Sequence, residues 1–203
     1  MKDKICIVVI SLVMGAAGGY IANTLQSNDK EAQITEYYAN SVATLQSPHG
    51  LRKMLANGTA KDKYVIVDVR SEEEYLDGHM VTALSIPAYT NKDNTEKTSE
   101  ERVIEDFRKL QAENPDKTIL VYCYSASCMT GRNVGNLLAQ NGVYVKDMTI
   151  GWNEWRYFPE VWNYPHEWED LNIMDYVVEG AEPGEVPKGL APKGCTLDGS
   201  LGC

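Results

Sequence analysis

Two cysteines, Cys123 and Cys128, stand between an apolar run, ILVYC at 119–123, and a segment with helical spacing, GRNVGNLLAQ at 131–140. In an open α/β sheet, ligands bind at the carboxyl ends of the strands. A thiol at that point faces the N–H groups of the turn and the positive end of the next helix, which favour the thiolate. The same donors suit a bound anion or a terminal persulfide. The pattern therefore favours Cys123 as a nucleophile.

Cys128 has three interpretations: a resolving thiol that pairs with Cys123, a second sulfur carrier, or a small apolar residue packed in the loop. A turn of this length lets the two Cα atoms reach disulfide distance. We predict a reversible disulfide between them, although Cys128 also stays open as the main nucleophile. Arg132 either offers a guanidinium to an anionic group at the helix start or faces solvent.

The surrounding segments predict a sheet that would position this turn. Short apolar runs alternate with helical patterns, which is typical of a mostly parallel sheet flanked by helices. Strands are expected within 63–70, 82–87, 119–123 and 143–152, and helices within 47–58, 71–78, 100–112 and 131–142. Asp68 and Arg70 follow the first strand and could form a buried ion pair, and His79 is expected to be a structural hydrogen-bonding residue.

The motif VIVDVRSEEEYLDGHMVTALSIP, followed by ILVYC, a cysteine-bearing turn, a helix and a GW-x-x-W ending, resembles the rhodanese-like, or sulfurtransferase, domain family. The resemblance covers roughly residues 47–155. It implies a rhodanese-like α/β fold with a central, mostly parallel five-stranded sheet, and an active-site loop after the fourth strand. It also points to Cys123 as the active-site cysteine, and it supports an ion pair of Asp68 with Arg70 that braces the adjacent loop.

The loop departs from the family pattern, because about two extra residues separate Cys123 from the next helix. Spacing disfavours a related phosphatase, which would have an arginine where this chain has Met129. The resemblance implies a sulfurtransferase that moves sulfane sulfur through a persulfide on Cys123, using a small sulfur donor or a protein thiol acceptor. The alternatives are a non-catalytic binding module with this fold and a thiol/disulfide redox protein that uses Cys123 and Cys128.

The ends of the chain predict four regions. Residues 1–25 form an apolar segment after Lys2 and Lys4, expected to be a signal sequence or a hydrophobic membrane-anchoring helix, with the domain outside the cytoplasm. Residues 26–46 are a polar spacer, 47–170 the rhodanese-like domain, and 171–203 a Gly/Pro-rich tail expected to lack regular structure. Cys195 and Cys203 could close a disulfide in an oxidising compartment.

Composition excludes several other classes of partner. The net charge is −10 and no Lys/Arg-rich run is present, so we expect no nucleic-acid partner. The three histidines, His49, His79 and His166, are too far apart in the sequence for a zinc motif, and we predict neither a metal nor a cofactor.

Overall fold

The computed structural model describes residues 29–190 and divides the chain into two compact units, Met1–Ala43 and Thr44–Cys203. In the first unit, the described residues are helical, and the helix continues to residue 44. The expected N-terminal hydrophobic helix, Cys6, Cys195 and Cys203 lie outside the described residues. Among residues 29–190, no helix is both long and apolar enough to cross a bilayer.

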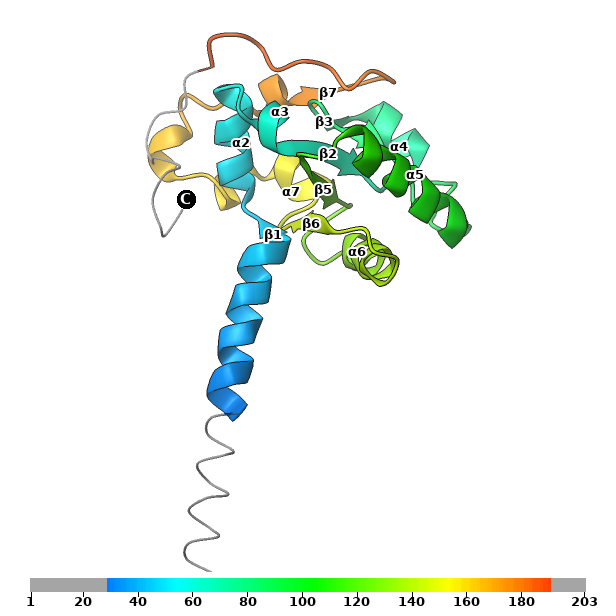
Figure 1. The fold of residues 1–203 in the computed structure, drawn as a ribbon. Helices are drawn as coiled ribbons and strands as arrows, with labels where there is room; N and C mark the ends of the chain where they lie inside the picture. Colours follow the sequence, from blue (N-terminus) through cyan, green and yellow to red (C-terminus); the bar gives the residue numbers. More distant parts are fainter. Residues whose placement is uncertain (1–28, 191–203) are drawn as a thin grey trace, which may run out of the picture. The chain divides into compact units, whose positions relative to one another are not determined.

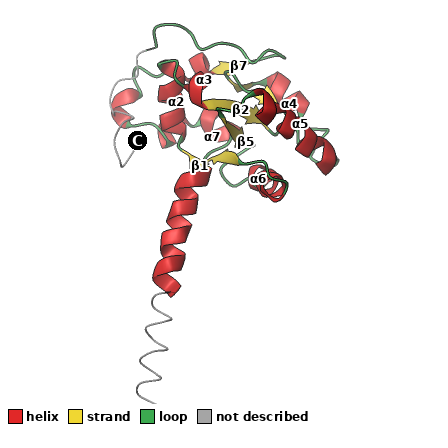
Figure 2. Ribbon diagram, in the orientation of Figure 1, coloured by secondary structure: helices red, strands yellow, loops and turns green. Residues whose placement is uncertain are grey.

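The second unit contains a five-stranded sheet in which every pair of neighbouring strands is parallel, in the order β1-β6-β5-β2-β4. The predicted fold class is therefore confirmed (Figures 1 and 2). The strands of this sheet are β1 (Leu45–Gln46), β2 (Tyr64–Asp68), β4 (Leu84–Ser85), β5 (Thr118–Tyr122) and β6 (Val145–Met148). A separate antiparallel pair joins β3 (His79–Met80) to β7 (Val177–Val178).

Helices cover both faces of the sheet (Figure 1). One face packs against α5 (Glu100–Glu113) and α6 (Thr130–Gln140), around Val67, Phe107, Val121 and Leu138. The other packs against α2 (Pro48–Ala56), α4 (Glu72–Asp77) and α7 (Trp152–Tyr157), with a short α3 (Ala60–Lys63) leading into β2. Because β2 and β5 are covered on both sides, their continuous apolar sequences are those of buried parallel strands.

Local sequence signals explain where the helices begin. Ser47 caps α2 by accepting a hydrogen bond from the Gly50 N–H, and Pro48 follows it at the first helical position. Ser71 and Glu74 form a reciprocal capping box at the start of α4. By contrast, α6 begins after Met129 without any side-chain cap, so the N–H groups of its first turn remain available beside the cysteines.

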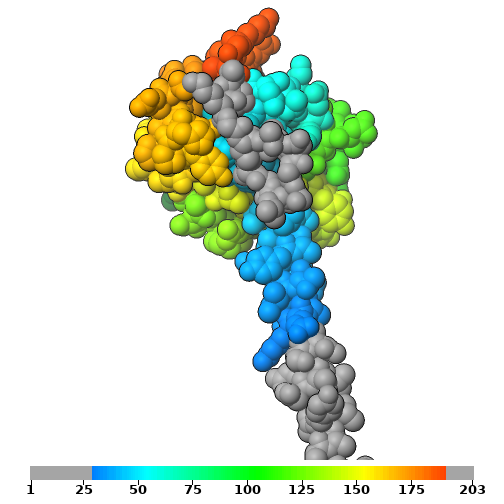
Figure 3. Space-filling view, turned by 90° about the vertical axis from the view of Figure 1, so that its left-hand side faces the viewer, coloured from blue at the N-terminus to red at the C-terminus, as the bar shows by residue number. Residues whose placement is uncertain are grey.

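Contrary to the prediction, regular structure continues after Asp170 as a 3₁₀ helix at Ile173–Tyr176 and as β7, whereas residues 179–190 contain neither helix nor strand. Tyr176 is buried in the core, β7 pairs with β3, and the Glu182 carbonyl oxygen lies 3.1 Å from His79 Nε2. The preceding aromatic-rich segment, residues 152–168, contributes to the surface of this unit, where Figure 3 draws it in yellow to orange. The Gly/Pro-rich stretch that follows is held by single backbone hydrogen bonds, from the Gly180 N–H to the Leu76 carbonyl oxygen at 2.8 Å and from the Thr82 N–H to the Pro183 carbonyl oxygen at 2.6 Å.

A buried charge cluster ties this aromatic-rich segment to α2. The Glu167 carboxylate lies 2.7 Å from His49 Nε2, 3.0 Å from an Arg52 nitrogen and 3.6 Å from Lys53 Nζ. Burial lowers the pKa of His49, which outweighs the opposing effect of Glu167. Burial alone would raise the pKa of Glu167, but its hydrogen bond with His49 and the charge of Arg52 lower it. A neutral His49 therefore donates its Nε2–H to an ionised Glu167.

Candidate functional site

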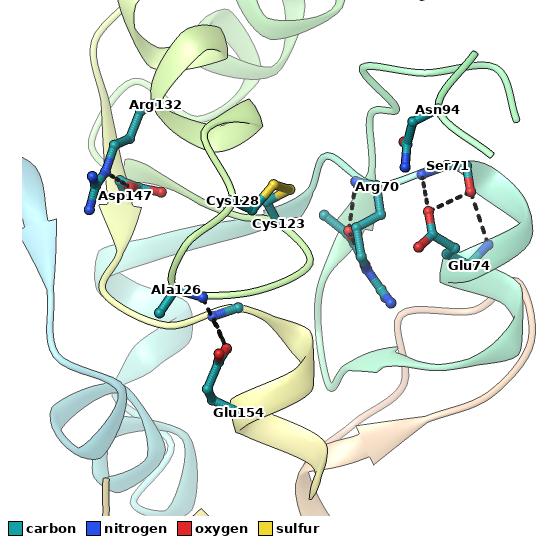
Figure 4. Close-up of a disulfide and its surroundings, with 12 residues drawn as sticks. Arg70, Ser71, Glu74, Asn94, Cys123, Ala126, Cys128, Arg132, Asp147 and Glu154 are labelled. Carbon is teal, nitrogen blue, oxygen red and sulfur yellow. Dashed lines mark hydrogen bonds and ion pairs between the residues drawn. A yellow bond between two sulfur atoms is a disulfide. The ribbon is translucent and has the colours of Figure 1, made fainter. Parts of the chain in front are cut away.

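Cys123 and Cys128 form a disulfide in the loop between β5 and α6 (Figure 4). Their Cα atoms are 6.4 Å apart, so the predicted pairing is present, and its reversibility stays a prediction. β5 ends at Tyr122, so Cys123 is the first residue beyond the strand rather than its last. Cys123 is 8% exposed, whereas Cys128 is half-buried. An external thiol therefore reaches Cys128 more readily than Cys123.

The first half of this loop is held against the start of α7. The Trp152 N–H donates to the Cys123 carbonyl oxygen at 2.8 Å, and the Asn153 N–H donates to that of Tyr124 at 2.9 Å. Glu154 accepts a hydrogen bond from the Ala126 N–H at 3.1 Å and another from the Gly151 N–H at 3.0 Å (Figure 4). The predicted GW-x-x-W ending therefore supports the cysteine loop, to which it is joined by these hydrogen bonds.

The Asp68–Arg70 ion pair expected from the sequence is present and buried beside this support. Arg70 bonds to Asp68 at 2.6 Å and donates to the Gly78 carbonyl oxygen at 2.6 Å. Burial opposes the charged guanidinium, yet the Asp68 carboxylate raises the pKa of Arg70 above its ordinary value. The guanidinium also lies 4.7 Å from the centre of the Trp152 ring. This network fixes Trp152, which in turn holds Cys123.

A buried tyrosine connects the same network to β3. The Tyr122 hydroxyl donates to Asp68 at 2.7 Å and accepts from the Met80 N–H at 3.0 Å. Burial raises the pKa of Tyr122 well above its ordinary value, so it is a neutral donor. His79 is buried, stacks on Tyr75 at 3.7 Å, and hydrogen-bonds through both ring nitrogens to backbone carbonyl oxygens. Its position agrees with the expected structural role.

Arg132 lies in the first turn of α6, where its guanidinium forms an ion pair with Asp147 at 3.6 Å. The Arg132 side chain is 54% exposed, so it also remains accessible to an anionic ligand. Within the described residues, no group of His, Cys, Asp and Glu side chains has the arrangement of a metal site. The site therefore consists of a cysteine pair, a helix start without a side-chain cap, and the exposed guanidinium of Arg132, which is paired with Asp147.

Sequence reasoning missed Glu154 and Asp147. A carboxylate three residues after Gly151 is the capping-box position of a helix, and this signal could have identified Glu154 as a loop contact. Asp147 gives no local signal, because its proximity to Cys123 arises from the pairing of β6 with β5.

Comparison with known proteins identifies the fold and the family. The family model of the Rhodanese-like domain matches residues 47–157, which include the cysteine loop and its support. Curated protein sequences gave no match.

Solved structures with a similar fold have low sequence identity. The BH2092 protein from Bacillus halodurans is 20% identical, with 70% of this chain and 99% of that chain covered and a TM-score of 0.48. A protein from Lactobacillus plantarum is 20% identical, with coverages of 64% and 92% and a TM-score of 0.43. A rhodanese from E. coli, solved with anions, is 23% identical, with coverages of 43% and 85% and a TM-score of 0.30. Since the family match spans more than half of the chain, this protein belongs to the rhodanese-like domain family.

Proposed function

We propose that this protein is a rhodanese-type sulfurtransferase that carries sulfane sulfur on Cys123. The observation that carries the proposal is the position of Cys123, directly after a central parallel strand and next to a helix start without a side-chain cap, within the segment that matches the family. Amide donors and the helix dipole favour a thiolate at this point, and a thiolate is the nucleophile that the chemistry needs.

The reaction consists of two exchanges at sulfur with no net redox change. The Cys123 thiolate attacks the outer sulfur of a donor persulfide, the donor S–S bond breaks, and the donor sulfur leaves with the electron pair. Cys123 then carries the persulfide. An acceptor thiolate attacks the outer sulfur, takes it as a new persulfide, and regenerates the Cys123 thiolate. The N–H groups at the start of α6 stabilise the anion in both steps.

Local charge favours a donor with little negative charge. The carboxylates of Glu154 and Asp147 lie beside the loop, and Arg132 is already paired with Asp147. A small persulfide or a protein thiol fits these conditions better than doubly charged thiosulfate.

The disulfide represents a closed form of the same site. While Cys123 is bonded to Cys128, it has no free thiolate, so a thiol reductant must open the pair before sulfur transfer. The disulfide also favours a second candidate function, in which the pair itself exchanges electrons with partner thiols. Because disulfides persist mainly in oxidising compartments, it supports the proposal that residues 1–25 direct or anchor the domain outside the cytoplasm.

The proposed function is tested by sulfurtransferase assays on the protein before and after reduction, with thiosulfate and an alkyl persulfide as donors and cyanide or a thiol as acceptor. Cys123→Ser should abolish transfer. The matched variant Cys128→Ser should retain transfer and no longer require prior reduction, because its Cys123 cannot be locked in the intramolecular disulfide. Equal activity of wild type and Cys123→Ser would remove Cys123 from the mechanism. Absence of transfer with every donor, together with an unperturbed Cys123 thiol pKa, would favour the binding module.

A further inference from the structure

A carboxyl group lies beside Cys123 on the same face of the sheet. Asp147 of β6 pairs in register with Val121 of β5, and Cys123 follows Val121 by two residues. Because side chains alternate along a strand, Val121 and Cys123 project toward the same face, the one covered by α6. A Cβ atom added to Gly131 of α6 would lie 2.9 Å from Asp147 Oδ1 and 3.8 Å from Cys123 Cβ. The carboxyl and the cysteine therefore flank the same glycine.

Few charged groups face this carboxyl. Arg132 is the only charged residue of α6, and its Nε lies 3.6 Å from Asp147 Oδ2. The neighbouring strands β5 and β1 contribute no charged side chain. Burial raises the pKa of Asp147, and the smaller opposing effect of Arg132 does not cancel it. The Asp147 side chain is still 20% exposed, which leaves a route for a proton to solvent.

We propose that Asp147 exchanges a proton with Cys123 when the Cys123–Cys128 disulfide opens and closes. This inference rests on the proposed use of Cys123 as a thiol that is freed by reduction. In the structure Cys123 Sγ is bonded to Cys128, but breaking that bond lets Sγ rotate about the Cα–Cβ bond. Glycine leaves empty the position that a Cβ atom would occupy within 4 Å of both groups, and we place the proton transfer across that position, through one water molecule.

The thiolate of an external thiol attacks the sulfur of Cys128, the more exposed of the pair, and forms a mixed disulfide with it. The Cys123–Cys128 bond breaks, and its electron pair stays on Cys123. As this bond breaks, the Asp147 carboxyl gives its proton to the Cys123 sulfur and becomes a carboxylate. On reoxidation the carboxylate takes the proton back, and Cys123 attacks the mixed disulfide to expel the external thiolate.

The test measures the rate at which dithiothreitol reduces the disulfide of the full chain across pH, divided by the concentration of dithiothreitol thiolate. In wild type this normalised rate should fall as pH rises through the Asp147 pKa. Asp147→Asn should abolish the fall and lower the rate at acidic pH by roughly tenfold. That is less than the 10²–10⁴ typical of general acid catalysis, because a stabilised thiolate already leaves well. Arg132→Gln should move the fall to higher pH, since the guanidinium that stabilises the carboxylate is gone.

A pair of glycine variants covers the case in which Asp147→Asn fails to fold. Gly131→Ala places a methyl group against the carboxylate and should also abolish the pH-dependent fall. Gly135→Ala, in the same helix, meets only Val145 Cγ2 at an ordinary 3.6 Å and should keep the wild-type profile. A fall that persists in Asp147→Asn, or in Gly131→Ala if the first variant does not fold, would overturn the proposal. This assay measures only the reduction of the disulfide. A protein that transfers no sulfur but keeps the pH-dependent fall in reduction rate would therefore refute only the proposed function.

Discussion

Replacing Gly151 by alanine should displace the cysteine loop. A Cβ atom at this position would overlap backbone atoms of Tyr124 and Ser125. Because the clash is with backbone atoms, a side-chain rotation cannot relieve it. The backbone of Gly151 is extended, with φ −108° and ψ −167°, a conformation open to any residue. The effect of Gly151→Ala is therefore purely steric, and it acts on the loop that carries Cys123.

The magnitude follows from the contacts that the loop would lose. Overpacking of this kind costs about 1–3 kcal/mol. Three hydrogen bonds hold the loop on the start of α7, from Trp152, Asn153 and Ala126. Each contributes about 0.5–1.5 kcal/mol, and partial loss of the three brings the expected destabilisation to about 2–4 kcal/mol. For a domain of this size each kcal/mol lowers the midpoint of thermal unfolding by about 2–4 °C.

The assay is thermal unfolding followed by far-UV circular dichroism, with Gly135→Ala as the matched control. The control adds a methyl group in an ordinary contact within α6 and should leave stability unchanged or raise it by up to about 1 kcal/mol. Gly151→Ala should unfold several degrees lower, and dithiothreitol should reduce its disulfide faster than that of wild type. A Gly151→Ala protein with wild-type midpoint and wild-type reduction rate would refute the reasoning that α7 holds the loop.

Three further predictions concern the buried ion pairs and the second cysteine. Because the folded pKa of Glu167 lies below 4.5 and that of His49 below 6.5, stability should decline as pH falls from about 7 through both values. Glu167→Gln should remove the part of the decline below about pH 4.5 and steepen the part below about pH 6.5, because Glu167 raises the pKa of His49. In urea unfolding it should cost about 3–5 kcal/mol at neutral pH, and an unchanged stability would contradict this. The Arg70 guanidinium bonds to Asp68 through two nitrogens, which a lysine cannot reproduce. Arg70→Lys should therefore lower the free energy of unfolding in urea by about 2 kcal/mol. An unchanged free energy would show that the two-nitrogen contact is dispensable. Cys128→Ala should keep its initial sulfur-transfer rate but lose activity faster than wild type under peroxide, and equal decay would return Cys128 to a packing role.

The parts of the fold that sequence predicted are those with local signals. The apolar runs of β2 and β5 and the helices expected within 47–58 and 71–78 each depend on a few consecutive residues, and all are present. The final strand is shorter than predicted, because the chain turns at Gly151 to begin α7.

The parts that sequence did not predict depend on contacts between distant segments. Glu167 contacts α2, which lies more than 100 residues earlier in the chain, and neither segment has a sequence pattern that predicts this contact. Asp147 reaches Cys123 only through strand pairing, and residues 171–190 are ordered by β3 and the core rather than by their own composition. Cys123 itself was found because a thiol between a buried strand and a helix is a local pattern.

The central claim, that Cys123 carries sulfane sulfur, is tested most directly by mass spectrometry of the intact protein and its peptides. The reduced protein is incubated with an alkyl persulfide, freed of donor and digested without reductant. We expect one added sulfur atom on the peptide containing Cys123, its absence in Cys123→Ser, and its loss when an acceptor thiol is added. Sulfur found only on Cys128, or on neither cysteine while wild type still transfers sulfur, would contradict it.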